Sequence, residues 1–306
     1  MSKIRKRLFC FGYGYTADYL GHELQTNHEG WTIGGTTRDP ERRQELLLRR
    51  IRARVFDYEH PIADPRTLFS RFSHLLISTP PDDRGDPVYN MHAEELINLP
   101  NLKWVGYLSS TGVYGNRNGA SVDETAEVTP TSQRGSRRAL AEQQWYSLFE
   151  KHNVPVHIFR LSGIYGPGRS ALDTMRAGIA RRVDKPGHVF NRIHVDDIVQ
   201  TIIASFKNPN PGQVYNLADD IPAPSHEVIA EACALLNMPA PPLIHHDEVD
   251  LSPIAQSFYK DNKHVLNDKI KRELGIELKY SNYRDGLKGC LAAEQNFIDQ
   301  QEKIII

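Results

Sequence analysis

The sequence predicts an α/β protein built on a doubly wound parallel sheet, with a smaller C-terminal lobe. Three observations support this prediction. Short apolar runs alternate with helical segments through the first half of the chain, a glycine-rich turn follows the first run, and proline-containing breaks gather after residue 205. A chain of 306 residues can form one large domain or two modest ones with an ample core.

The first half of the chain predicts six strands and the helices between them. Residues 8–11 form an apolar strand, and a helix over 18–25 follows the glycines. Residues 31–37 form the second strand, and a charged helix over 38–48 follows with Pro40 in its first turn. The later strands are expected at residues 55–56, 74–79, 103–110 and 156–161. Apolar runs of this kind, alternating with helices, indicate a parallel sheet covered on both faces.

The second half is richer in loops. Residues 163–170 are expected to form a loop, 214–217 a short strand, and 227–236 a helix capped by Ser225. Further helices are expected at residues 173–183, 198–206, 269–274 and 283–300. We therefore predict a sheet domain over residues 1–165 and a lobe over 166–306, with segments near 191–218 returning to the sheet domain.

Composition excludes several classes of protein. A net charge of −1 argues against a general nucleic-acid binder, and no apolar run approaches the roughly eighteen residues that span a membrane. Basic residues near the start precede an apolar run too short for a signal peptide, so we expect a cytoplasmic protein. Cys10, Cys233 and Cys290 fit neither a zinc site nor a disulfide framework. The His245-His246 pair lacks a second ligand cluster, so no metal site is predicted.

The glycine-rich turn is the first candidate binding site. The order of strand, Gly12-x-Gly14-x-x-Ala17 turn and helix is the one that binds a dinucleotide diphosphate. Gly12 permits the sharp turn, Gly14 lets the backbone approach phosphate oxygens, and Ala17 allows close packing of helix on strand. The N–H groups of the helix start, around Tyr15 and Thr16, are then expected to bind the anion.

Four later segments extend this pattern along nearly the whole chain. They are residues 108–115 (LSSTGVYG), 159–169 (FRLSGIYGPGR), 193–198 (IHVDDI) and 214–218 (VYNLA). In this order, and with the glycine turn, the chain resembles the extended short-chain dehydrogenase/reductases, the family of NAD(P)-dependent nucleotide-sugar epimerases and dehydratases. The resemblance implies a Rossmann fold, with the active site at the carboxyl ends of the strands and a C-terminal lobe for a small-molecule substrate.

The resemblance also places residues at the cofactor. Thr37 and Arg38 end the second strand, where an acidic side chain binds a ribose 2′-hydroxyl and a basic one accommodates a 2′-phosphate. With Arg42 and Arg43 one turn further on, we interpret Arg38 as a preference for NADP, with NAD as the alternative. In that alternative Arg38 is a solvated loop residue and Asp39 binds the ribose.

Two further strand ends match cofactor positions of the family. Asp57 matches an acid that contacts adenine, although a turn or helix cap explains it equally well. Ser78 and Thr79 match the strand end that passes the cofactor ribose. Pro80 and Pro81 depart from the small residues usual after that strand.

The catalytic pattern is incomplete. Ser110 fits the family's serine or threonine, which hydrogen-bonds a substrate oxygen. The family's Tyr-x-x-x-Lys pair is missing, and Arg134 and Arg138 stand at its two positions. An arginine stays protonated at neutral pH and cannot act as a general base, so neither replaces the tyrosine. Arg138 can still bind the ribose, and Arg134 can bind a carboxylate or phosphate.

Three interpretations of this absence remain open. In the first, another group transfers the proton, and the candidates are Tyr114, Tyr165 and His194, whose ordinary role is packing. In the second, the chemistry needs no base beyond the hydride transfer. In the third, the protein binds NADP without turnover, as a sensor or scaffold. We expect NAD(P)-dependent redox or epimerase-like chemistry on a polar small molecule, such as a nucleotide-sugar. Arg134 and Arg169 are candidate anion contacts, and the protein is expected to be a monomer or homodimer.

Overall fold

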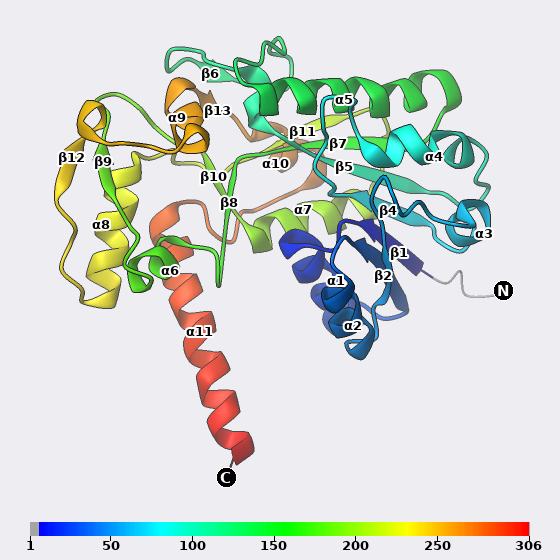
Figure 1. The fold of residues 1–306 in the computed structure, drawn as a ribbon, viewed down its shortest axis with the longest axis horizontal. Coiled ribbons are helices and arrows are strands. Elements are labelled where there is room, and N and C mark those ends of the chain that lie inside the picture. The colour runs from blue at the N-terminus through cyan, green and yellow to red at the C-terminus, as the bar shows by residue number, and fades with distance from the viewer. Residues whose placement is uncertain (1–5, 306) are drawn as a thin grey trace. The chain divides into compact units, whose positions relative to one another are not determined.

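The computed structural model describes the backbone of residues 6–305 and the side chains of residues 6–253 and 255–295. The chain divides into two compact units, each assembled from separate stretches of sequence. Unit 1 contains residues 6–113, 132–160 and 199–215, and unit 2 contains residues 114–131, 161–198 and 216–305. Figure 1 shows the course of the chain through both units.

Unit 1 is built on a seven-stranded sheet in the order β11-β7-β5-β4-β1-β2-β3. Its strands are β1 (Lys6–Phe11), β2 (Trp31–Thr37), β3 (Arg52–Val55), β4 (His74–Ile77), β5 (Trp104–Ser110), β7 (Val156–Leu161) and β11 (Val214–Leu217). Strand β1 pairs in parallel with β2 on one side and with β4 on the other. The order of strands reverses at β1, so the predicted doubly wound parallel sheet is confirmed.

Helices cover both faces of this sheet. They are α1 (Tyr15–Asn27), α2 (Pro40–Leu48), α3 (Pro65–Phe69), α4 (Pro87–Ile97), α5 (Gln133–His152) and α7 (Val195–Lys207). The Trp104 indole of β5 donates a hydrogen bond to Ser205 of α7 at 2.8 Å, whereas the Tyr107 ring of β5 stacks on Trp145 of α5. In Figure 1, α4 and α5 accordingly lie on one side of the sheet, and α1 and α7 lie on the other.

Three helices of unit 1 begin with the same dipeptide. Asp39, Asp64 and Asp86 are the N-cap residues of α2, α3 and α4, and a proline follows each of them. Each carboxylate accepts a hydrogen bond from a backbone N–H of the first turn, and proline has the φ angle that the first helical position needs. The Asp-Pro dipeptides therefore fix where these helices start, directly after the loops that follow β2, β3 and β4.

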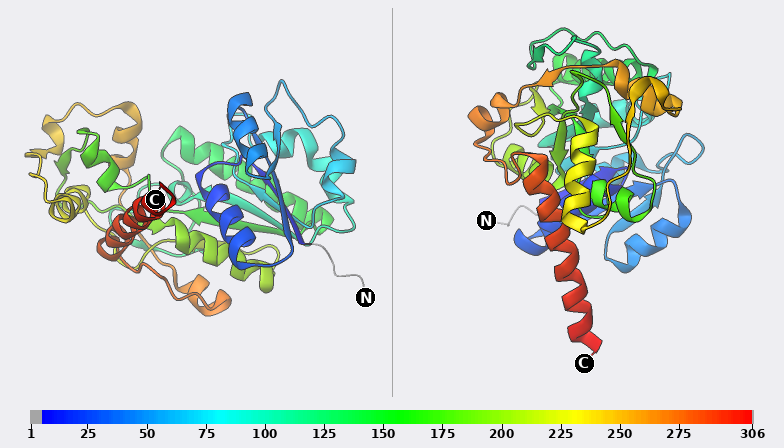
Figure 2. Two further views of the ribbon diagram at one scale, coloured as in Figure 1. Left: turned by 90° about the horizontal axis from the view of Figure 1, so that it is seen from below. Right: turned by 90° about the vertical axis from the view of Figure 1, so that its left-hand side faces the viewer.

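Unit 2 combines short strand pairs with helices. The pairs are β6 (Ser121–Val122) with β13 (His264–Val265), β8 (Gly163–Tyr165) with β10 (Arg192–His194), and β9 (Arg182–Asp184) with β12 (Leu243–His245). The helical segments are η1 (Thr111–Tyr114), which begins at the end of unit 1, α6 (Ala171–Arg176), α8 (Ser225–Leu236), η2 (His246–Glu248), α9 (Pro253–Lys260), α10 (Asp268–Leu274) and α11 (Tyr283–Ile305). Helices α6, α8 and α11 pack together around a core that includes Leu172, Ala232 and Leu287 (Figure 2).

Three predictions for this unit were wrong in detail. The helix expected over 173–183 ends at Arg176, because Gly178 adopts a left-handed φ of 67° and stops the helix, and the chain then forms β9. The expected loop over 163–170 contains β8, which pairs with β10. Helix α8 begins at Ser225 itself, with Pro224 as an N-cap that offers no side-chain hydrogen bond.

Candidate functional site: the carboxyl ends of the strands

The turn after β1 requires glycine at its first position. Gly12 has a φ of +81°, a conformation that L side chains rarely adopt. A Cβ there would lie 3.1 Å from the backbone nitrogen of Thr79 and 3.2 Å from the carbonyl carbon of Ser78. The Gly12 N–H donates to the Thr36 hydroxyl at 2.9 Å. The turn is thus held close against the ends of both β2 and β4.

The start of α1 is open. Gly14 is its N-cap and offers no side-chain hydrogen bond to the first-turn amides. A Cβ on Gly14 would meet nothing within 4 Å, whereas Thr16 and Ala17 are buried against the sheet. The start of α1 therefore borders open space at Gly14, at the positive end of a 13-residue helix. This geometry suits an anion such as a diphosphate.

At the end of β2, the acidic and basic side chains have different environments. The Asp39 carboxylate accepts a hydrogen bond from the Glu41 N–H at 2.8 Å as the cap of α2, and the Thr37 hydroxyl accepts one from the Asp39 N–H at 3.1 Å. Arg38 is exposed. Of the arginines on α2, Arg42 pairs with Asp18 of α1 at 3.4 Å. The acid is thus engaged in capping, and Arg38 extends from the strand end into solvent.

Asp57, after β3, organises a tight turn. Its Oδ1 atom accepts hydrogen bonds from the Glu59 and His60 N–H groups, both at 2.9 Å, and lies 2.8 Å from the His60 ring nitrogen. The bond from the His60 side chain, followed by these amide bonds, holds the pKa of Asp57 below its usual value. All three bonds involve one oxygen, so the structure shows the turn-forming role that we considered for Asp57.

The carboxyl group of Asp86 is buried beside Thr79, just after the end of β4. The Thr79 hydroxyl donates to Asp86 Oδ2 at 3.4 Å, and Asp86 Oδ1 accepts from the Val88 and Tyr89 N–H groups. The Asp86 side chain is fully buried, and burial raises its pKa to about 6. The sequence analysis missed Asp86, although the Asp-Pro dipeptide at a helix start was a signal that could have found it. Asp86 thereby links the start of α4 to the candidate cofactor position at Thr79.

Arg138 of α5 lies against the carboxyl end of β5. One of its terminal nitrogens donates to the Leu108 carbonyl at 2.6 Å and to the Tyr107 hydroxyl at 3.1 Å. Ser110 ends β5, is half-buried, and accepts a hydrogen bond from the Gly112 N–H at 3.1 Å. The structure thus brings Arg138 to β5, the strand that ends at Ser110. Arg134 lies one turn before Arg138 on the same helix and is exposed.

The other candidates for proton transfer are buried in unit 2. The Tyr114 hydroxyl donates to Asn216 at 2.7 Å, and its side chain is fully buried. His194 accepts a hydrogen bond from the Asp196 N–H at 3.1 Å, and burial lowers its pKa to about 4. Tyr165 is buried, and burial raises its pKa. These environments suit the packing roles that we considered beside the catalytic ones.

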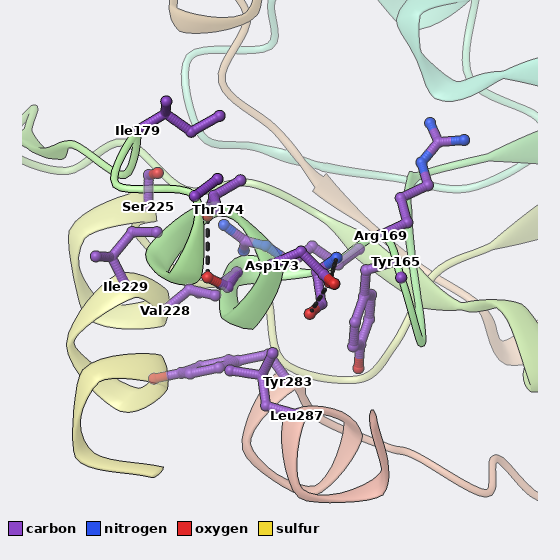
Figure 3. Close-up of a pocket in the computed structure, with 15 residues that line it drawn as sticks. Tyr165, Arg169, Asp173, Thr174, Ile179, Ser225, Val228, Ile229, Tyr283 and Leu287 are labelled. Carbon is purple, nitrogen blue, oxygen red and sulfur yellow. Dashed lines mark hydrogen bonds between the residues drawn. The ribbon is translucent and has the colours of Figure 1, made fainter. Parts of the chain in front are cut away.

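Unit 2 contains a pocket of about 530 Å³, shown in Figure 3. Its wall includes Asp173 and Ile229 from α6 and α8, and Tyr283 and Leu287 from α11. Arg192 also lines it, and one terminal nitrogen of Arg192 donates to two backbone carbonyls, each at 2.9 Å. Arg169 lines the rim, and in Figure 3 its side chain extends away from Tyr283 and Leu287.

The described residues contain neither a metal-ligand cluster nor a membrane-spanning helix. Among them, no group of three or more histidine, cysteine, aspartate or glutamate side chains is arranged to hold a metal ion. Within the same part of the chain, no helix combines the length and apolar character needed to cross a membrane.

Comparison with known proteins connects this architecture to a family. Residues 93–218 match the model of the NAD dependent epimerase/dehydratase family. Protein YeeZ of Escherichia coli (strain K12) is 31% identical over 233 residues, which cover 72% of this chain and 79% of YeeZ.

Two solved structures are similar to this chain. A functionally unknown conserved protein from Silicibacter pomeroyi is 46% identical with a TM-score of 0.85, and the match covers 94% of this chain and 99% of the other. UDP-glucuronic acid 4-epimerase from Bacillus cereus, in complex with UDP-glucuronic acid and NAD, has the same fold with a TM-score of 0.76 at 17% identity, over 96% and 99% of the two chains.

The doubly wound sheet and the open glycine turn define a Rossmann-type protein of the extended short-chain dehydrogenase/reductase class. The chain belongs to the NAD dependent epimerase/dehydratase family. The family resemblance drawn from the sequence is therefore confirmed.

Proposed function

We propose that this protein is an NADP-dependent enzyme that performs redox or epimerase-like chemistry on a polar, anionic small molecule. The observation that carries this proposal is the turn from Gly12 to the uncapped start of α1. Nucleotide-sugars are the first substrate class to test, since a structural neighbour of this fold is a UDP-glucuronic acid 4-epimerase in complex with NAD.

The residues of unit 1 fit a dinucleotide. The first-turn amides of α1 would hold the diphosphate, because the space above Gly14 is open and the helix dipole favours a negative charge there. Ser78 and Thr79 lie directly beside this turn, since a Cβ on Gly12 would touch their backbone. They would follow the cofactor towards β5.

The choice of NADP over NAD rests on the end of β2. Asp39 uses its carboxylate to cap α2, which argues against its binding a ribose 2′-hydroxyl. Arg38 is exposed at the position where a 2′-phosphate would lie, and a guanidinium can bind a phosphate through two parallel hydrogen bonds. Thr37 would contribute its backbone and its hydroxyl.

At the other end of the cofactor, Ser110 and Arg138 would serve the reaction. When bound, the nicotinamide supplies a hydride donor or acceptor. The Ser110 hydroxyl accepts a bond from the Gly112 N–H, which orients its own hydrogen away from that amide and towards a substrate oxygen. The Leu108 carbonyl and the Tyr107 hydroxyl hold Arg138 in place, so that its remaining N–H groups can bind the ribose.

The substrate's anionic group would bind in the pocket of unit 2. Arg192 is half-buried there, and burial lowers its pKa, but an arginine side chain stays protonated in proteins. Its two bonds to backbone carbonyls fix the orientation of the guanidinium. Arg169 at the rim would be a second anion contact, and Tyr283 a flat apolar surface for a ring.

A second candidate function is a sensor that binds NADP without turnover. Arg134 and Arg138 at the family's tyrosine and lysine positions favour it, since neither can remove a proton at neutral pH. Tyr114 could take over proton transfer only if its buried hydroxyl were released from its hydrogen bond to Asn216.

One experiment separates the two functions. Calorimetry with NADPH and NADH first establishes binding and cofactor preference. Purified protein is then incubated with NADP and a panel of nucleotide-sugars, and with NADPH and a panel of carbonyl compounds. Products are followed by reduced-nicotinamide absorbance and by chromatography. Turnover that falls sharply in Ser110→Ala supports the enzyme, whereas tight binding without any product supports the sensor. The absence of binding to both cofactors would contradict both functions.

A further inference from the structure

The Arg84 guanidinium lies over the Tyr58 ring at the edge of the candidate cofactor site, and the two side chains form a cation–π stack. Tyr58 follows β3, and Arg84 belongs to the loop that follows β4. The guanidinium carbon of Arg84 lies 3.6 Å from the centre of the Tyr58 ring, which is a close cation–π contact. The Arg84 side chain remains 64% exposed, so the guanidinium face away from Tyr58 is accessible to a ligand.

Hydrogen bonds from neighbouring side chains hold Tyr58 and Arg84 in place. The Tyr58 hydroxyl lies 3.5 Å from Asp82 and accepts a hydrogen bond from the Asn90 side chain at 3.2 Å. The same Asn90 amide donates to the Arg84 carbonyl at 3.0 Å. The Gln144 side chain of α5 accepts a hydrogen bond from the backbone N–H of Asp86 at 2.7 Å, at the end of the loop that contains Arg84. Both loops therefore hold the stack in place before any ligand arrives, which reduces the entropic cost of binding.

The charge of Arg84 is already balanced. Its Nε and one terminal nitrogen donate to Asp82 Oδ2 at 3.1 and 2.6 Å. Asp82 in turn accepts the N–H of Arg84 at 2.8 Å. An arginine paired in this way offers a ligand its flat face rather than a net positive charge. Its ligand should accordingly be an aromatic ring rather than a phosphate.

The fold determines which ring can reach this position. With the diphosphate at α1 and the adenosine ribose at the end of β2, the chain of the cofactor continues towards the loop after β3, where Tyr58 lies. We propose that Arg84, stacked on Tyr58, forms one wall of the adenine subsite and that the adenine ring stacks on the exposed face of its guanidinium. This inference deepens the proposed function and rests on it.

The test compares variants and cofactors by calorimetry. Arg84→Ala removes the flat face, and Arg84→Lys keeps the charge and can keep the pair with Asp82 but has no planar group. Loss of a stacked base costs about tenfold in affinity, so both variants should raise the Kd of NADPH and of NADH by a similar factor of roughly ten. Arg71→Ala is the matched control, because Arg71 is an exposed arginine of unit 1 that precedes the amino end of β4, whereas Arg84 follows the carboxyl end of that strand.

Each outcome has a defined meaning. Equal weakening of both cofactors in both Arg84 variants, with an unchanged control, supports the stack. A loss confined to NADPH and rescued by Arg84→Lys would mean that Arg84 binds the 2′-phosphate, and would overturn the inference. Unchanged affinity in Arg84→Ala would overturn it as well, while leaving the proposed function intact. A wild type that binds neither cofactor would overturn both.

Discussion

Gly14 and Gly12 provide a matched pair for testing the cofactor turn. In Gly14→Ala the new methyl group enters open space, and the backbone φ of −96° suits alanine. Alanine is a poorer N-cap than glycine by roughly 0.5–1 kcal/mol, but it also restricts the unfolded chain by about 0.4–1 kcal/mol. The two effects oppose each other, so the free energy of unfolding should change by less than about 0.5 kcal/mol.

In the proposed complex, the same methyl group would occupy the place of the diphosphate. Blocking one charge-assisted hydrogen bond costs about 1.5–3 kcal/mol, which corresponds to a roughly 10- to 100-fold increase in the Kd of NADPH. Gly12→Ala differs, because its φ of +81° and backbone contacts at 3.1 and 3.2 Å predict a loss of about 1–3 kcal/mol in stability.

The assay pairs urea unfolding with calorimetric titration of NADPH for both variants. We expect Gly14→Ala to fold like the wild type and to bind weakly, and Gly12→Ala to be destabilised. If Gly14→Ala bound NADPH with wild-type affinity while its stability was unchanged, the diphosphate would not lie at α1 and the placement of the cofactor would be refuted.

Three further predictions concern unit 1. Arg38→Ala should raise the Kd of NADPH at least about tenfold and leave that of NADH unchanged in calorimetry, because one phosphate contact is lost. Asp86 has a folded-state pKa of about 6, above its unfolded value of 3.8. The unfolded state therefore ionises first, and the wild type should lose up to about 3 kcal/mol relative to Asp86→Asn as the pH rises from about 4 to 6 in urea unfolding. Glu142→Gln breaks the buried pair with Arg160, whose atoms lie 2.7 Å apart, and should cost about 3–5 kcal/mol by the same method.

These predictions have clear contrary results. Equal loss of NADPH and NADH binding in Arg38→Ala would exclude a 2′-phosphate contact. A difference between Asp86→Asn and the wild type that does not change between pH 4 and 6 would mean that the carboxyl titrates normally. For the buried pair, replacing both partners by methionine should recover much of the stability lost in Glu142→Gln. Failure of that recovery would point to packing rather than to loss of the Glu142–Arg160 ion pair.

Local signals made much of the sheet predictable. The observed bounds of β2, β7 and β11 are those expected from the sequence, because each strand is rich in β-branched or aromatic residues and lies between turn-forming or charged residues. The three-residue strands β8 and β9 are too short to show a period and depend on partners far along the chain. Gly178 ended α6 early, a local signal that the apolar spacing of residues 173–183 obscured.

In the candidate site too, features that depend on neighbouring residues were predictable, whereas contacts between distant segments were not. The conformation of the Gly12–Gly14 turn depends on residues close in sequence, so the glycine spacing, together with the preceding strand and the following helix, indicated this turn. Its binding of a cofactor stays a prediction. The contact of Arg138 with Leu108, and of Tyr58 with Arg84, joins segments that only the folded sheet brings together. The capping role of Asp39 was readable from Asp-Pro, but it was overlooked because the ribose offered a competing explanation.

The interleaved path of the chain limits how this protein can be recombined with its relatives. The pocket of unit 2 takes Tyr165 and Arg192 from one stretch of sequence and Ser225 and Tyr283 from another. A chimaera with a single crossover near residue 216 would join halves of that pocket from two parents. To transplant this pocket intact, a donor must supply both residues 161–198 and the stretch from 216 onward, while the recipient keeps 199–215 for its own sheet unit.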